Sequence, residues 1–137
     1  MAETRAEAAP VQDIAAIAEG IIKKLKRNRR NEIELTTAQI RKFLSAVNAL
    51  TNKISMYRTR CGETNVLSPE LAAEVKFLKV KLAYQVARNR ETVGDLEKKA
   101  NLMARIDQIG TDMKKYDVFI HFVEALVAYH KFHDRRD

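Results

Sequence analysis

Residues 36–60 read TTAQIRKFLSAVNALTNKISMYRTR, and this segment has the pattern of a long amphipathic helix. Thr36 is followed three residues later by Gln39, which is the capping-box pattern that begins many helices. Apolar side chains then recur every three or four residues and form one face: Ile40, Phe43, Leu44, Val47, Leu50, Ile54 and Tyr57. We expect this helix to end near Cys61–Gly62 and to bury that face in a core.

Apolar residues at helical spacing predict four further helices, at about 11–30, 69–90, 92–110 and 111–132. Ser68–Pro69 is a strong start signal for the second of these, because Ser caps a helix and Pro fits its first position. The composition agrees, since 137 residues contain only 4 Gly and 2 Pro. We therefore predict an all-α fold, a single-domain bundle of about five helices. The expected domain limits are a flexible N-terminal tail at 1–10, the bundle at 11–133 and a C-terminal tail at 134–137.

The sequence predicts no catalytic site, cofactor or metal site. Cys61 is the only cysteine, so an intramolecular disulfide and a thiolate metal site are excluded, and its simplest interpretation is a small core residue. His130 and His133, with Asp134, do not complete a closed metal site, and we interpret them as a solvated terminus. The glycines are isolated, so there is no Gly-rich phosphate loop. An enzyme is therefore not expected.

The net charge of +7 is concentrated in one part of the chain. Between residues 23 and 60 only Glu32 and Glu34 are acidic, and residues 35–62 contain no carboxylate. The basic residues of this part are Lys23, Lys24, Lys26, Arg27, Arg29, Arg30, Arg41, Lys42, Lys53, Arg58 and Arg60. Such a localised positive field favours a polyanionic partner.

Four residues of the predicted helix at 69–90 share one stripe: Phe77, Lys81, Tyr84 and Arg88. Bases stack on aromatic rings while neighbouring cations hold phosphates, so this stripe suits a single-stranded nucleic acid. In the alternative interpretation, Phe77 and Tyr84 belong to the core and are flanked by snorkelling cations. Spacing alone favours that alternative.

Three blocks of the sequence resemble a known family. They are LTTAQIRKFL at 35–44, FLKVKLAYQVAR at 77–88 and FIHFVEALVAYHK at 119–131. In order and spacing they are similar to the small subunit of type III-A CRISPR interference complexes, the helical Csm small-subunit family. The similarity spans most of residues 20–133, with a mild departure at Ala87, where Gly or a similar residue is usual.

The resemblance implies a helical bundle without an active site, present in several copies beside the subunits that carry the guide RNA. Its implied partners are guide RNA and target RNA, the other subunits of the complex and copies of itself. The resemblance implies that basic residues of the matching helices face the RNA, here Arg41, Lys42, Lys53, Lys81 and Arg88. Charge clustering adds Arg58 and Arg60, and the aromatic stripe adds Tyr84, as candidate RNA-binding residues.

Two other classes of protein stay open. One is a homo-oligomeric helical module that binds acidic partners, which predicts a stable dimer and no salt-dependent RNA binding. The other is a peripheral membrane adaptor, although Ile14–Leu25 lacks a Trp or Phe anchor. No apolar stretch approaches the ~20 residues that span a bilayer, and the N-terminus lacks a signal-peptide pattern. We therefore expect a soluble cytoplasmic protein without a membrane partner.

Overall fold

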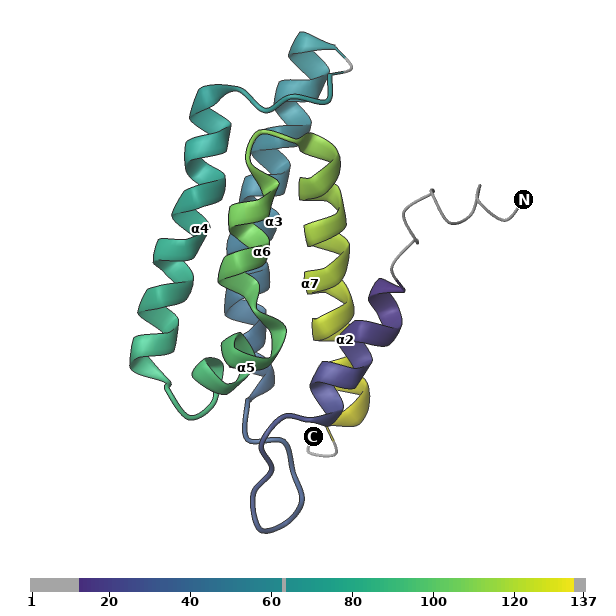
Figure 1. The fold of residues 1–137 in the computed structure, drawn as a ribbon, viewed down its shortest axis with the longest axis vertical. Coiled ribbons are helices and arrows are strands. Elements are labelled where there is room, and N and C mark those ends of the chain that lie inside the picture. The colour runs from purple at the N-terminus through teal and green to yellow at the C-terminus, as the bar shows by residue number, and fades with distance from the viewer. Residues whose placement is uncertain (1–12, 63, 135–137) are drawn as a thin grey trace, which may run out of the picture.

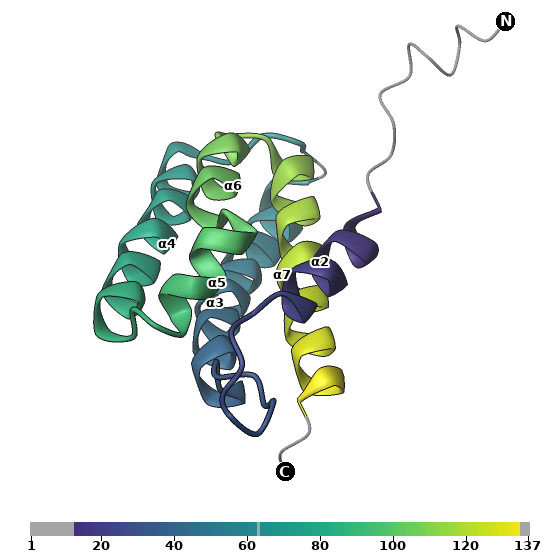
Figure 2. The same ribbon diagram turned by 60° about the horizontal axis from the view of Figure 1, so that its bottom comes forward.

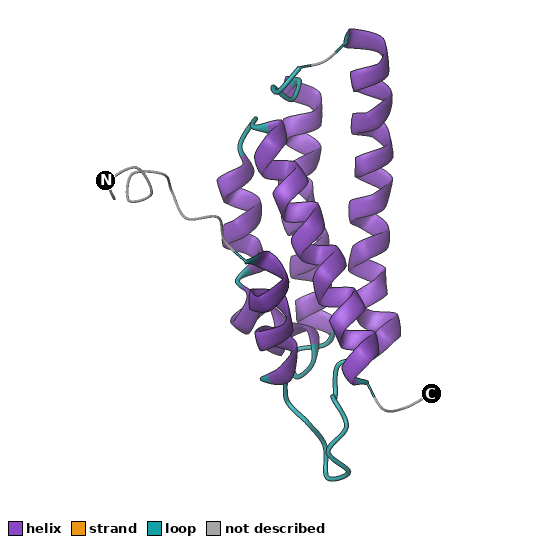
Figure 3. Cartoon of the chain, turned by 90° about the vertical axis from the view of Figure 1, so that its right-hand side faces the viewer, coloured by secondary structure: helices purple, strands orange, loops and turns teal. Residues whose placement is uncertain are grey.

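The computed structural model describes residues 13–62 and 64–134. In these residues the chain forms helices and loops and no β-strand (Figure 3), which confirms the all-α prediction. The helices of the described residues are α2 (Ile14–Lys23), α3 (Thr37–Cys61), α4 (Pro69–Arg88), α5 (Val93–Ala100), α6 (Leu102–Ile109) and α7 (Met113–His133). The predicted N-terminal tail at 1–10 lies outside the described residues.

Four helices form a ring around the core. Helix α3 packs against α4 and α7, and α6 packs against the same two helices from the other side (Figure 1). The α3–α4 seam and the α6–α7 seam therefore lie on opposite sides of the bundle. Helix α2 packs across α7, while α5 lies near the end of the bundle where α3 begins (Figure 2).

The start signals predicted at Thr36 and Ser68 are both confirmed by hydrogen bonds, whereas the Thr92 side chain makes no capping bond at the start of α5. Thr36 Oγ1 accepts from the Gln39 backbone N–H at 3.1 Å, and Gln39 Oε1 accepts from the Thr36 N–H at 3.0 Å. Ser68 Oγ accepts from the Leu71 N–H at 3.2 Å. These bonds satisfy backbone donors that the first turn of a helix leaves without an intrahelical partner.

Helix α2 is shorter than predicted, because it ends at Lys23 and not near residue 30. The following loop buries Leu25, Ile33 and Leu35 in the core. At its tip the Asn28 side-chain oxygen accepts the backbone N–H groups of Arg30 at 2.8 Å and Glu32 at 3.0 Å. Asn side chains favour turns through such local bonds, and here the bonds replace helical ones.

The single helix predicted at 92–110 is in fact two helices, α5 and α6. They are separated by Asn101, which adopts the left-handed conformation with φ 56°. Asn tolerates this conformation better than most side chains. The Glu97 carboxylate then accepts the Met103 backbone N–H at 3.2 Å, which caps α6.

Two interpretations of single residues were wrong. Cys61 is exposed and does not belong to the core. His130 is fully buried and lies 2.6 Å through Nε2 from the Leu35 carbonyl oxygen, so it is no part of a solvated terminus. His133 Nε2 lies 2.8 Å from Glu19 Oε2 and joins α7 to α2. Both imidazoles thus connect the last helix to elements far away in the sequence.

None of the described helices combines the length and the apolar character that crossing a bilayer requires.

Candidate nucleic-acid interface

Helices α3 and α4 pack side by side and run antiparallel (Figure 1). Four hollows of about 320, 380, 440 and 210 Å³ lie along the seam between them. Each hollow shares lining residues with the next one in this order. The first and second hollows share Lys53, and the second and third share Ala46 and Lys81. The third and fourth share Lys42, Tyr84 and Gln85. They therefore form one continuous depression, which we call the α3/α4 groove.

The groove brings together six of the eight candidate RNA-binding residues. They are Lys42, Lys53, Arg60, Lys81, Tyr84 and Arg88. Helical periodicity explains the grouping, because the three α3 cations lie on the flank of that helix which faces α4. Cations from two sequence segments thus line one depression.

Arg41 and Arg58 do not line the groove. Arg41 is exposed on α3 outside the four hollows. Arg58 faces α7, where its guanidinium donates to Asp117 Oδ2 at 3.0 Å and its Nε approaches the sulfur of Met113. The structure thus gives Arg58 a role in joining α3 to α7.

The two halves of the groove differ in charge. In the half near residues 60 and 70, the lining includes Glu70 and Glu74, and Lys53 Nζ donates to Glu74 Oε1 at 2.9 Å. That ion pair is exposed to solvent, and such pairs contribute only ~0–1 kcal/mol. A phosphate can therefore compete with Glu74 for Lys53.

The other half of the groove, which we call the cationic half, is lined by Lys42, Lys81 and Arg88 and by no carboxylate. Among the described residues, none of these three cations has an ion pair within 4.0 Å. All three are exposed. This half is the part of the groove that is best suited to a chain of phosphates.

Aromatic rings lie beside these cations at the surface. Phe77 is 54% exposed and Tyr84 is 62% exposed, so the interpretation of both as core residues was wrong. Lys81 Nζ lies 6.0 Å from the Phe77 ring centroid, and the Arg88 guanidinium carbon lies 5.8 Å from that of Tyr84. Each exposed ring therefore has a cationic group, which is able to bind a phosphate, about 6 Å from its centre.

A polar cluster that sequence reasoning missed sets the width of the cationic half. The Gln85 amide donates to the Gln39 carbonyl oxygen at 2.9 Å, and the Gln39 amide donates to Asn89 Oδ1 at 3.2 Å. These bonds tie the last turn of α4 to the first turn of α3, and so they position Lys42 relative to Arg88. The sequence contains a signal for it, because Gln85 follows Leu82 by three residues and so continues the apolar face of α4, which also includes Leu71, Val75 and Leu78. The structure buries Gln85 on that face.

Over 13–62 and 64–134, no three His, Cys, Asp or Glu side chains gather closely enough to hold an ion.

The matching family model and the similar proteins indicate the same family. The model of the family described as Csm2 Type III-A matches residues 8–136. A protein named CRISPR system Cms protein Csm2 from Streptococcus thermophilus is 32% identical over 120 residues, covering 88% of this chain and 90% of that protein. Proteins of the same name from Mycobacterium tuberculosis, strains CDC 1551 / Oshkosh and H37Rv, are 29% identical over 109 residues, covering 80% of this chain and 83% of theirs. The chain therefore belongs to the Csm2 type III-A family, the small subunits of type III-A CRISPR complexes.

Proposed function

We propose that this small subunit is a non-catalytic RNA-binding protein that holds target RNA along the α3/α4 groove in antiviral defence. The observation that carries the proposal is the cationic half of the groove, where Lys42, Lys81 and Arg88 meet without a carboxylate. Family membership supports an RNA-guided complex as the setting, and we place its action in the cytoplasm.

The proposed mechanism is electrostatic positioning. Lysine and arginine side chains neutralise phosphates whatever the base sequence, so they fix the strand and do not read it. In an RNA-guided complex the sequence is read by pairing with the guide. The role we propose requires no catalytic group on this subunit.

The exposed rings add a second contribution. Phe77 and Tyr84 offer faces on which unpaired bases can stack, and such stacking contributes ~1–3 kcal/mol per base. Stacking tolerates every base, which agrees with a surface that must accept any target. We therefore include Tyr84 with the five groove cations as RNA-binding residues.

We further propose that several copies of the subunit line up beside the guide and target RNA. Exposed apolar side chains outside the groove support contacts between proteins, because Val66 and Phe132 are each more than half exposed. Stacked copies would join their grooves into a longer track for the strand.

Charge reversal in the cationic half tests the proposal. The variant Lys42→Glu/Lys81→Glu/Arg88→Glu is compared with the matched control Lys76→Glu/Lys98→Glu/Lys114→Glu, which makes the same change in net charge at exposed positions outside the groove. Binding of a fluorescein-labelled single-stranded RNA is followed by anisotropy at several salt concentrations. Loss of three phosphate contacts should reduce the slope of log K against log salt by about 2 in the groove variant.

The control variant separates local contacts from the general field of the protein. It should lose some affinity, because its net charge falls equally, but should keep most of the wild-type salt slope. Equal losses in both variants, or an unchanged affinity in the groove variant, would overturn the proposal. The second result would favour the homo-oligomeric module that binds acidic proteins.

A further inference from the structure

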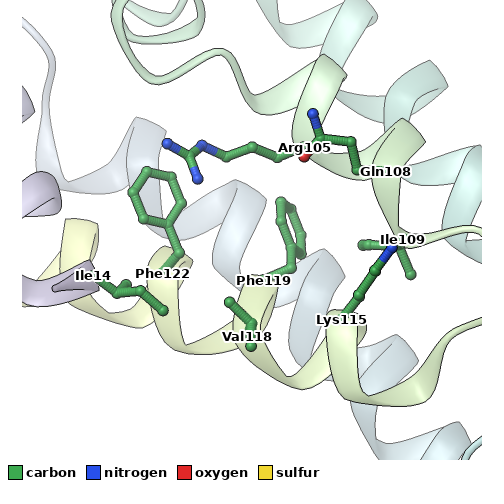
Figure 4. A pocket seen from close by; sticks show the side chains of 8 residues that line it. All are labelled: Ile14, Arg105, Gln108, Ile109, Lys115, Val118, Phe119 and Phe122. Carbon is green, nitrogen blue, oxygen red and sulfur yellow. The ribbon is translucent and has the colours of Figure 1, made fainter. Parts of the chain in front are cut away.

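A second depression lies on the opposite side of the bundle from the α3/α4 groove. It has a volume of about 310 Å³ and lies between α6, α7 and the first turn of α2. Figure 4 shows Phe119 and Phe122 of α7 at its apolar floor, with Ile14 at one side and Arg105 and Lys115 reaching in from two other directions. We call it the α6/α7 pocket. A volume of this size accommodates one large apolar side chain.

Arg105 is the unusual residue of this pocket. Its guanidinium carbon lies 3.9 Å from the Phe122 ring centroid, and its Nε donates to the Ala100 carbonyl oxygen at 2.9 Å. The stacking and the hydrogen bond hold the planar group in one orientation. Burial lowers the pKa of Arg105, and over residues 13–62 and 64–134 the guanidinium has no carboxylate within 4.0 Å.

The charges around the pocket are unbalanced. Arg105 and Lys115 are its two charged lining residues, and both are positive. A fixed guanidinium can bind a carboxylate through two parallel N–H donors, which is the arrangement that this side chain favours. The pocket thus presents an apolar floor and a cationic rim, and the complementary ligand is an apolar group with a carboxylate beside it.

A second copy of this chain is a poor match for that combination, because its net charge is +7 and the carboxylates beside two of its exposed apolar side chains are already bonded. Asp134, two residues after Phe132, accepts from Thr37 Oγ1 at 3.3 Å, and Asp117, next to Val118, pairs with Arg58. Its exposed side chains on α4, Phe77, Val80 and Tyr84, have Lys81 and Arg88 as neighbouring groups. Docking them in the α6/α7 pocket would bring cations against Arg105 and Lys115. Like charges placed together in an interface are strongly unfavourable, so the occupant is a different chain.

We propose that the α6/α7 pocket binds an acidic segment of another protein of the complex. In this segment a large apolar side chain fills the cavity above Phe119 and Phe122, and nearby Asp or Glu carboxylates pair with Arg105 at one side of the pocket and Lys115 at the other. The contact leaves the opposite side of the bundle free, so one subunit binds RNA at the α3/α4 groove and a protein at the α6/α7 pocket. The proposal does not depend on RNA binding by the groove.

A photo-crosslinking residue at the pocket tests which chain occupies it. Val118 lines the pocket and is 50% exposed, so Val118→p-benzoylphenylalanine places the reactive ketone at the rim without disturbing the core. The variant is produced together with the other subunits of the complex, the assembled complex is irradiated, and the crosslinked peptide is identified by mass spectrometry. The matched control is Val80→p-benzoylphenylalanine in the α3/α4 groove, where the side chain is 53% exposed.

The expected crosslink from position 118 is to a segment of another subunit that carries Asp or Glu within a few residues of a large apolar side chain. The probe at position 80 should not capture that segment. A crosslink from position 118 to a second copy, to residues 1–12 of the same chain or to no protein overturns the proposal.

Charge removal tests the chemistry of the contact. Lys115→Gln should reduce the yield of the position-118 crosslink, and Arg105→Gln should reduce it roughly tenfold or more, because a charge-assisted hydrogen bond is lost. Arg105→Lys should restore only part of the yield, since lysine lacks the planar pair of donors. Lys114→Gln is the control, because Lys114 is exposed next to Lys115 but does not line the pocket.

RNA binding by each isolated variant is measured in parallel. It should equal that of the Lys114→Gln control, which distinguishes loss of the protein contact from failure of the RNA-binding proposal. Because Lys115 is exposed, its replacement leaves the fold intact, and an unchanged crosslink in Lys115→Gln together with Arg105→Gln contradicts the proposed pairing.

Discussion

Arg58 and Lys81 show at the residue scale that equal charges have different roles in this protein. Arg58 lies in an ion pair with Asp117, with about a third of its side chain exposed. Lys81 lies in the groove without an ion pair among the described residues. The contacts of each cation, and not its charge, therefore separate a residue that joins two helices from a residue that we propose binds RNA.

This difference predicts opposite effects of two neutral substitutions. Arg58→Gln should lower the free energy of unfolding by about 0.5–1 kcal/mol, as expected for a partly exposed ion pair, and leave RNA affinity nearly unchanged. Lys81→Gln should lower RNA affinity and leave stability nearly unchanged. Urea unfolding and RNA anisotropy, measured on both variants, test the two predictions. A large loss of RNA affinity in Arg58→Gln would show that Arg58 contributes to RNA binding.

Tyr116 is the second residue whose environment has a measurable consequence. It is fully buried, its hydroxyl donates to the Val47 carbonyl oxygen at 3.2 Å, and it lies 2.9 Å from Thr51 Oγ1. Burial raises the pKa of Tyr116 to about 12. The phenol must therefore stay neutral for the protein to be at full stability.

The raised pKa of Tyr116 gives a pH dependence with a definite sign. The folded state holds the phenolic proton more tightly than the unfolded state, so the contribution is complete below pH 10.0 and is lost as pH rises through about 12. The difference in free energy of unfolding between wild type and Tyr116→Phe should shrink over this range. Urea unfolding of both proteins at a series of pH values measures it, and a constant difference would contradict the assignment.

At the scale of the helices, Asn101 decides whether residues 93–109 form one rod or two. Its φ of 56° costs ~1–2 kcal/mol for most side chains and almost nothing for glycine. The break lets two short helices follow the end of the bundle, and each buries apolar side chains in the same core, Leu96 from α5 and Ile106 from α6.

Substitution of Asn101 tests this account. Asn101→Gly should be close to neutral, whereas Asn101→Val should lower the free energy of unfolding by ~1–2 kcal/mol, because a β-branched side chain resists the left-handed region. Chemical denaturation of the two variants provides the comparison. If valine were tolerated as well as glycine, the left-handed residue would not be what separates α5 from α6.

At the scale of the whole molecule, the bundle presents two different surfaces on opposite sides. The α3/α4 groove is lined by five cations and two carboxylates, and the α6/α7 pocket has an apolar floor and two cations. Four helices in a ring separate the two surfaces, so ligands on both sides can be bound at once. This arrangement suits a subunit that connects a nucleic acid to other proteins.

The whole-molecule field predicts a strong salt dependence of RNA binding. If four groove cations neutralise phosphates of a single strand, the slope of log K against log salt is about −0.7 per contact, and affinity should fall roughly fiftyfold between about 50 and 200 mM salt. Anisotropy titrations with unlabelled competitor measure the slope. A flat salt response would exclude phosphate contacts as the basis of binding.

Periodicity and caps in the sequence determined most of the helices. The boundaries of α3, α4 and α7 lie within about two residues of those predicted, because capping and apolar spacing act over a single turn of helix. The concentration of cations on the helix at 36–60 was equally readable, since charge is a property of each residue. The family could also be predicted from the sequence, because three blocks of residues resemble it.

Tertiary structure alone decided where the side chains at the edges of those patterns lie. Helical spacing could not distinguish Phe77 and Tyr84 from core residues, and the packing of α4 against α3, α5 and α6 left both exposed at the groove. His130 is buried against Leu35, which is 95 residues away in the chain. Partners so distant in sequence meet only when the helices pack, and a local pattern contains no information about which of its faces will find a neighbour.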